Sequence, residues 1–124
     1  MKQGFLDKAK ENLKIARMSF DAGCHNACAN RAYYAAFQAA IAALAAHGST
    51  KGKNDHKWVQ SEFNRRLVRR QKIYPAKLKT YLFEMQPVRN IADYSKDNVS
   101  KEVARKQLSQ AAEMVQLIER RLSK

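Results

Sequence analysis

Hydrophobic residues recur every three or four positions through most of this chain, which is the spacing of one face of an α-helix. The pattern predicts a first helix over residues 3–22 and a second over residues 26–47. Gly23 and Gly48 follow them, and glycine favours the end of a helix. The second helix is apolar on nearly every side. A helix of that kind is expected in the middle of a bundle or between two subunits.

A third helix is predicted after the polar loop 48–54, with Asn54 or Asp55 placed to cap it. Three of its residues are spaced to point inward: Val59, Phe63 and Leu67. Tyr74-Pro75 predicts a break, because the residue before a proline is driven out of helical geometry.

The remaining sequence predicts a fourth and a fifth helix. The fourth has an apolar stripe from Leu78 to Ala92, and Pro87 is expected to kink it or to split it before Val88. Ser100 is placed to cap the fifth helix, whose apolar positions alternate by three and four. No strand pattern is visible. We therefore predict an all-α fold, an up-and-down antiparallel bundle of four to five helices in a single domain, residues 1–124.

The composition supports the helical prediction, and the net charge indicates which kind of partner the protein favours. The 124 residues include only 4 glycines and 2 prolines, so few breaks are expected. Lys and Arg number 24 against 11 Asp and Glu, a formal net charge of +13. Ten of these cations lie between Lys51 and Lys79, where only Asp55 and Glu62 oppose them, so this stretch carries +8. Such a balance favours polyanionic partners, although it is also compatible with a merely soluble basic protein.

Neither a metal, a cofactor nor a membrane is predicted. Cys24, His25 and Cys28 are three possible zinc ligands, but no fourth lies nearby in the sequence, and we expect two free cysteines in a reducing cytoplasm. The glycines are isolated, so no phosphate-binding loop is recognised, and no nucleophile motif can be placed. The N-terminus lacks the apolar core of a signal peptide. The longest apolar stretch, residues 27–46, is interpreted as a buried helix rather than a membrane span.

Polar residues in apolar surroundings supply the candidate sites. Arg31 lies in the most apolar helix, either at its rim in water or in an ion pair, for which Asp93 is the best candidate. Arg89 and Asp93 are four apart and share a helix face, as a local ion pair or with Arg89 as a phosphate-binding cation. His56 is a possible general acid or base, or a surface residue. The neighbouring Trp58 is either a half-buried anchor or a platform for a base.

The run Asn30–Leu44, NRAYYAAFQAAIAAL, resembles the signature helix of the HEPN family, in the subgroup with an Arg-Ala-Tyr-Tyr-Ala start. The resemblance continues through His56, through EFNRRLVRRQKIY at Glu62–Tyr74, and into RNIADY at Arg89–Tyr94. It ends with an amphipathic last helix and so covers nearly the whole chain in the expected order.

The resemblance implies a helical bundle that forms a homodimer through its central helices. It also implies a frequent partnership with a small nucleotidyltransferase, often as a toxin–antitoxin pair. Catalytic relatives resemble metal-independent ribonucleases, with an arginine and a polar residue followed by a histidine after four to six intervening positions. Arg89 and Asn90 match the start of this motif. Tyr94, Ser95 and Lys96 stand where the histidine is expected, and a tyrosine, with an ordinary pKa of about 10, is a poor base at neutral pH.

Three hypotheses follow. The first is a mainly binding HEPN protein that holds RNA or nucleotide phosphate. Its expected binding residues are Arg89, Asn90, Lys57, Arg65, Arg66 and Arg69. The second is an active ribonuclease toxin in which Arg89 stabilises the scissile phosphate and His56 or Tyr94 replaces the missing base. The third is a non-enzymatic scaffold or antitoxin-like subunit whose charge complements an acidic partner protein.

Overall fold

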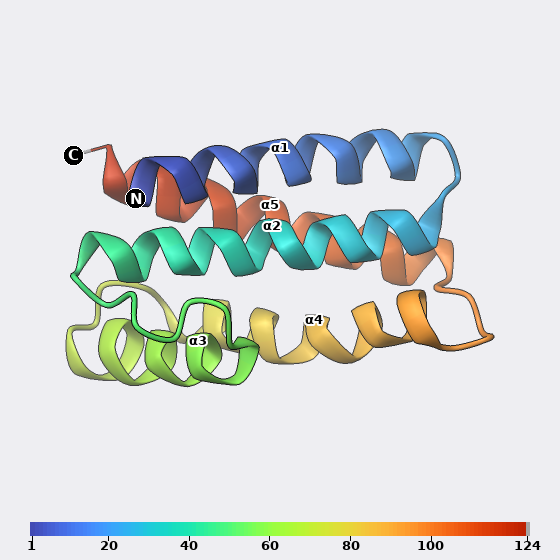
Figure 1. Ribbon diagram of the computed structural model, residues 1–124. Helices are drawn as coiled ribbons and strands as arrows, with labels where there is room; N and C mark the ends of the chain where they lie inside the picture. The colour runs from blue at the N-terminus through green and yellow to red at the C-terminus, as the bar shows by residue number, and fades with distance from the viewer. Residues whose placement is uncertain (124) are drawn as a thin grey trace.

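Five α-helices and one π-helical segment form the part of the chain described by this computed structural model, residues 1–123. In chain order they are α1 (Lys2–Asp21), α2 (His25–Ala46), α3 (His56–Glu62), its continuation η1 (Phe63–Arg70), α4 (Ala76–Tyr94) and α5 (Lys101–Leu122). Helices α1 and α2 run in opposite directions, as do η1 and α4, and α4 and α5 (Figure 1). Helix α3 instead runs in the same direction as α2, because the loop between them returns along the bundle. The N-terminus lies at the same end of the bundle as the end of α5. The described residues contain no strand, and the predicted all-α bundle is confirmed.

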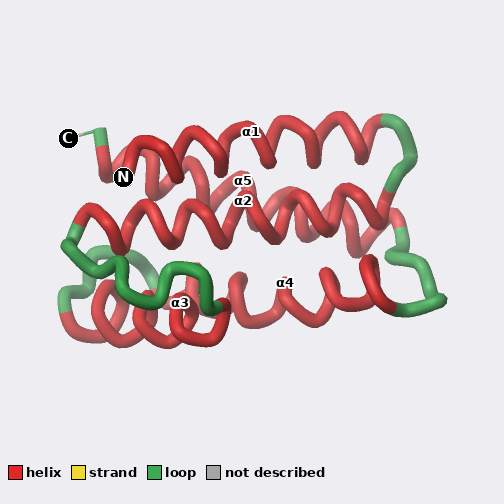
Figure 2. Tube along the Cα trace, in the orientation of Figure 1, coloured by secondary structure: helices red, strands yellow, loops and turns green. Residues whose placement is uncertain are grey.

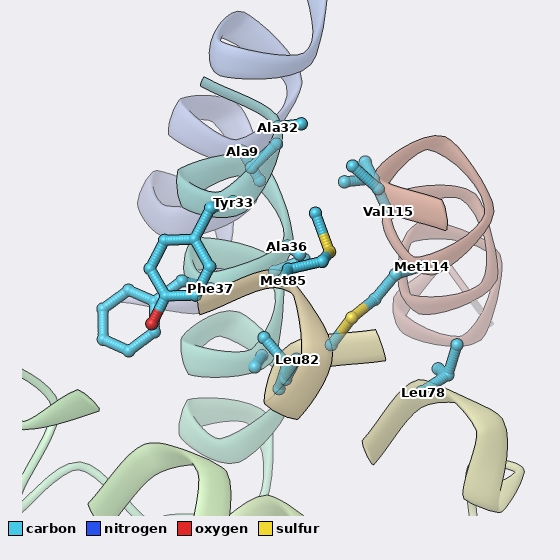
Figure 3. Packing of buried hydrophobic residues seen from close by; sticks show 14 of the residues in the cluster. Ala9, Ala32, Tyr33, Ala36, Phe37, Leu78, Leu82, Met85, Met114 and Val115 are labelled. Atoms are coloured by element: carbon cyan, nitrogen blue, oxygen red, sulfur yellow. The ribbon is translucent and has the colours of Figure 1, made fainter. Parts of the chain in front are cut away.

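Helix α2 lies at the centre of the bundle and contacts α1, α3, η1, α4 and α5. Of its 22 residues, 13 are buried, most of them alanines. Alanine is the strongest helix former, and its small side chain lets neighbouring helices approach closely. Figure 3 shows Tyr33 and Phe37 projecting to one side of α2, away from Met114 and Val115 of α5. The predicted burial of this helix is confirmed, and none of the helices in residues 1–123 is long and apolar enough to cross a membrane.

The side-chain caps predicted for the starts of α3 and α5 are both formed. The Asp55 carboxylate accepts hydrogen bonds from the backbone N–H groups of Lys57 and Trp58 at 3.0 and 3.2 Å. The Ser100 hydroxyl accepts one from the N–H of Val103 at 3.2 Å. Side-chain caps of this kind satisfy N–H groups that have no partner within the helix.

One expectation for α4 is corrected. The sequence allowed Pro87 to split this helix before Val88, but α4 is continuous from Ala76 to Tyr94. Proline removes one backbone hydrogen bond and crowds the preceding turn. The buried side chains of Leu82 and Met85 just before it anchor the helix in the core, so tertiary packing outweighs that local cost.

The π-helical end of the third helix was not predicted from the sequence. Its last eight residues form the π-helical segment η1, in which Phe63 and Leu67 are buried. The chain then turns at Lys72, which has a positive φ of 53°, and the N–H groups of Ile73 and Tyr74 donate to the Leu67 carbonyl at 2.8 and 3.2 Å. Figure 2 shows the loop that precedes α3 folding back along the bundle, so that α3 begins near the middle of the molecule.

Candidate functional site

A cluster of aromatic rings from α2 receives His56, the first residue of α3. The imidazole is stacked on Phe37, with ring centroids 4.2 Å apart, and lies nearly parallel to the Tyr33 ring at 5.5 Å. Its Nδ1 atom lies 2.6 Å from the Tyr33 hydroxyl oxygen. Tyr33 and Phe37 are four residues apart and therefore share one face of α2, as Figure 3 shows. Because the Asp55 cap sets where α3 begins, it also positions His56 against these rings.

Helix α4 adds Arg89 to the same cluster. The guanidinium carbon lies 5.4, 5.6 and 5.7 Å from the ring centroids of Tyr33, Tyr34 and Tyr94. Nη1 donates to the Tyr34 hydroxyl at 3.0 Å, and Nη2 donates to Asn90 Oδ1 at 3.2 Å. Only 12% of the Arg89 side chain is exposed, and its Nε is buried without a partner among the described residues. The faces of the tyrosine rings stabilise this cation where water has been excluded.

Asp93 completes the cluster and corrects one prediction. Its carboxylate accepts two hydrogen bonds from Asn30 Nδ2, at 3.0 and 2.9 Å, and lies 3.6 Å from Arg89 Nη1. Arg31 is instead exposed and donates to Asn12 Oδ1 at 3.2 Å. The predicted ion pair between Arg31 and Asp93 is therefore wrong. Successive residues of an α-helix differ by about 100° in direction, so Asn30 faces α4 and Arg31 faces α1.

The surroundings favour the uncharged forms of His56 and Tyr33. Burial, reinforced by the positive charge of Arg89, lowers the pKa of His56, and Asp55 opposes this only weakly. Burial raises the pKa of Tyr33 to about 12. When the protonated Tyr33 hydroxyl donates to Nδ1, the neutral imidazole carries its hydrogen on Nε2. In that tautomer His56 offers a hydrogen-bond donor rather than a base.

The six predicted binding residues fall into separate regions. Lys57 and Asn90 line a hollow of about 350 Å³, and the Asn90 side chain is hydrogen-bonded to Arg89. Arg65 and Arg69 line a different hollow of about 400 Å³, and Arg65 also forms an ion pair with Glu62 at 2.6 Å. Arg66 donates to the His47 carbonyl at 2.5 Å, which ties η1 to the end of α2.

The other candidates have structural surroundings. Tyr94 is 77% exposed, although its ring lies beside Arg89. Trp58 is half-buried against the core, as expected of an anchor. Cys24 is exposed and Cys28 is buried, and burial raises the pKa of Cys28 to about 11. Within the described residues, no group of three His, Cys, Asp or Glu side chains is placed to hold a metal ion.

Several residues of this region were not identified from the sequence. Tyr33 and Tyr34 lie within the run Asn30–Leu44 that carries the family resemblance, but their contacts with His56 and Arg89 depend on how three helices pack. Gln60, Phe83 and Gln86 share the hollow with Lys57 and Asn90, and no local pattern distinguishes them. One feature of the sequence points to this hollow. Phe83 is a large apolar residue that lies outside the buried stripe of α4.

The all-helical fold agrees with a comparison against known families. The HEPN domain family model matches residues 3–121 of this chain. The chain therefore belongs to the HEPN domain family, and the resemblance carried by its Arg-Ala-Tyr-Tyr-Ala helix is confirmed. Membership of this family indicates a function connected with nucleotides or RNA. Among curated proteins, none matches the sequence.

Proposed function

We propose that this protein binds RNA or nucleotides through the surface around Arg89 and Asn90, and that it acts mainly by binding. One observation carries the proposal: Arg89 is fixed among tyrosine rings directly beside Asn90, which shares a hollow with Lys57. A fixed cation and an adjacent flexible one attract phosphate oxygens, and an amide adds hydrogen-bonding groups. The cations of residues 51–79 extend the positive charge away from this point.

His56 fits a binding role better than a catalytic one. Its lowered pKa keeps the imidazole neutral, and with the Tyr33 hydroxyl as donor to Nδ1 the ring hydrogen lies on Nε2. Such a group donates a hydrogen bond to a phosphate oxygen, but does not accept the proton of a ribose hydroxyl. Arg65 and Arg69, in their separate hollow, would contact a more distant phosphate of the same strand.

A homodimer is part of the proposal. The apolar sides of α2 are already covered by the other helices of the same chain. Exposed apolar residues are found near the end of α4, where Ile91 is 43% and Tyr94 is 77% exposed, and the Tyr94 ring lies beside Arg89. Because apolar surface favours association, pairing of two chains through this part of α4 would bring two Arg89 side chains near one cleft.

A nucleotidyltransferase partner in a toxin–antitoxin pair, and a cytoplasmic location, are proposed from the family resemblance and from the free cysteines. The competing scaffold or antitoxin-like role requires only an acidic protein partner. Purification of the tagged chain with its genomic neighbours distinguishes these roles. A nucleotidyltransferase recovered together with RNA supports the proposal, whereas an acidic protein recovered without nucleic acid supports the scaffold.

Salt-dependent RNA binding tests the main proposal. Fluorescence anisotropy with a labelled single-stranded RNA should show affinity that falls steeply as salt rises, because phosphate contacts release counterions. Lys57→Ala should weaken binding by roughly tenfold, the effect of losing about 1.4 kcal/mol. Arg17→Ala, on the outer helix α1, is the matched control and should bind like the wild type. Salt-independent affinity, or equal effects of the two substitutions, would contradict the proposal.

A ribonuclease remains the second candidate because Tyr33 brings His56 and Arg89 into one cluster. Incubation of a quenched fluorescent RNA with the protein in EDTA measures metal-independent cleavage directly. The binding proposal expects the RNA to stay intact. Cleavage by the wild type that is lost in both His56→Gln and Arg89→Lys would instead establish a nuclease, and retention in Tyr94→Phe would exclude that phenol as the base.

A further inference from the structure

The hollow beside Asn90 combines an exposed aromatic ring with several amides. It lies between α3 and α4 and has a volume of about 350 Å³, within the roughly 300–1,000 Å³ typical of small-ligand sites. Its lining residues are Lys57, Gln60, Phe83, Gln86, Pro87 and Asn90. Phe83 is 69% exposed, although phenylalanine is among the residues most often buried. An open ring of this kind offers a flat face to a ligand.

The amides around this ring are held in a defined orientation. Gln60 Nε2 donates to Gln86 Oε1 at 2.6 Å, which connects α3 to α4. This bond leaves Gln60 Oε1 as an acceptor and Gln86 Nε2 as a donor. Asn90 Oδ1 accepts from Arg89 Nη2, so Asn90 Nδ2 also remains available as a donor. The lining therefore presents both donors and an acceptor on side chains that are already restrained.

Charge at this place favours a phosphorylated ligand. None of the described residues that line the hollow is acidic, and Lys57 is exposed at its edge. Arg89 lies directly behind Asn90, to which it is hydrogen-bonded. A ligand with a flat apolar face, an edge of donors and acceptors and a nearby phosphate would use all of these groups. A nucleotide has these three parts.

We infer that this hollow is a nucleobase subsite that takes one unpaired base of a single-stranded RNA or a free nucleotide. This inference rests on the proposed function and names the substrate class of that surface. The base stacks on Phe83, and its edge pairs with the amides of Gln60, Gln86 and Asn90. Lys57 neutralises the adjoining phosphate. Bases in a duplex are excluded because their faces and edges are already occupied.

Binding of matched oligonucleotides to the full chain tests the subsite. The probes are labelled eight-residue oligouridylate and oligoadenylate, a duplex of the same length, and an abasic strand with the same backbone. The wild type should prefer both base-bearing single strands. Phe83→Leu keeps an apolar side chain but removes the stacking face, and should weaken binding of these strands by about 5- to 150-fold. Binding of the abasic strand should not change. Phe5→Leu, the same change on α1, is the control.

Failure of the subsite can be distinguished from failure of the proposed function. If the wild type binds none of the probes, both are overturned. If it binds the abasic strand as tightly as the others, and Phe83→Leu behaves like Phe5→Leu, only the subsite is overturned. Light scattering provides a second test of the subsite. If Phe83→Leu converts a dimer into a monomer, this ring contacts the second chain rather than a base, and the subsite is overturned. Circular dichroism of the variants checks that each remains folded.

Discussion

At the scale of single residues, Tyr33 holds the polar site together. Its ring is fully buried, its hydroxyl contacts His56, and one face of the ring lies under Arg89. One side chain thus joins residues from α3 and α4 through α2. The neighbouring Tyr34 supports the other side of Arg89 through its hydroxyl. Buried tyrosines commonly combine an apolar body with a polar tip in this way.

The half-buried imidazole of His56 makes the stability of the fold depend on pH. His56 has a lowered pKa in the folded chain, whereas its ordinary pKa is 6.5. The unfolded chain therefore takes up a proton more readily, and protonation favours unfolding. The free energy of unfolding should have its full value above pH 6.5 and decrease as the pH falls through 6.5 toward the lower pKa of the folded chain. Urea unfolding at about pH 7.5 and about pH 5.5 measures the decrease.

Two variants distinguish the contributions of His56 and His47 to the pH dependence of stability. Burial and the charges of Arg66 and Arg121 also lower the pKa of His47. His56→Gln and His47→Gln should each lose less stability than the wild type over the same pH interval, because each removes one such imidazole. A decrease in His56→Gln as large as in the wild type would show that this ring is not a source of the dependence.

At the scale of elements, the connection from η1 to α4 carries an unusual conformation. Lys72 has a φ of 53°, a region that costs a side chain with a Cβ about 1–2 kcal/mol but is natural for glycine. The turn places Tyr74 in the core, where its ring stacks on Phe63 with centroids 5.5 Å apart. The strain at one residue is thus offset by the packing of others.

Relief of this strain can be measured. Lys72→Gly should raise the free energy of unfolding by roughly 0.5–1 kcal/mol, because removal of the Cβ outweighs the added freedom of the unfolded chain. Lys79→Gly, an exposed position inside α4, should lower it by about 1 kcal/mol, the ordinary cost of glycine in a helix. Urea denaturation of both variants gives the comparison, and destabilisation by Lys72→Gly would argue against a strained turn.

At the scale of the whole molecule, apolar residues are divided between the core and an exposed part of α4. The alanines of α2 are used within the chain, whereas Phe83, Ile91 and Tyr94 remain exposed on α4. We propose that a nucleobase binds at Phe83 and that a second copy of the chain binds at Ile91 and Tyr94. Of the residues that border these two places, Asn90 at the hollow and Tyr94 are in contact with Arg89.

The dimer has a matched test. Ile91 and Ile15 are similarly exposed, at 43% and 40%, but Ile15 lies on α1. Size-exclusion chromatography with light scattering should give the wild type twice the chain mass of 14.2 kDa. Ile91→Asp should give a monomer, because a charge in an apolar interface is costly, and Ile15→Asp should remain a dimer. Equal masses for both variants would place the interface elsewhere.

Much of the fold was predictable because it depends on local periodicity. The stripe through Leu6 and Leu13, the caps Asp55 and Ser100, and the break at Tyr74-Pro75 all act over one or two turns of chain. Each of these features involves near neighbours in the sequence, so the residue pattern alone specifies it. The charge of the 51–79 stretch and the family resemblance were likewise readable from the sequence.

Only the tertiary structure decided which side chains meet. The sequence identified Arg89, Asp93 and His56 and offered the Arg89–Asp93 pair, which the fold contains. It also offered Arg31 as a partner of Asp93, where the fold uses Asn30. Periodicity determines which residues share a helix face, yet the face that meets a neighbouring helix depends on how all the side chains between them pack. For that reason the cluster around Tyr33 and the hollow at Phe83, each assembled from different helices, could be found only in three dimensions.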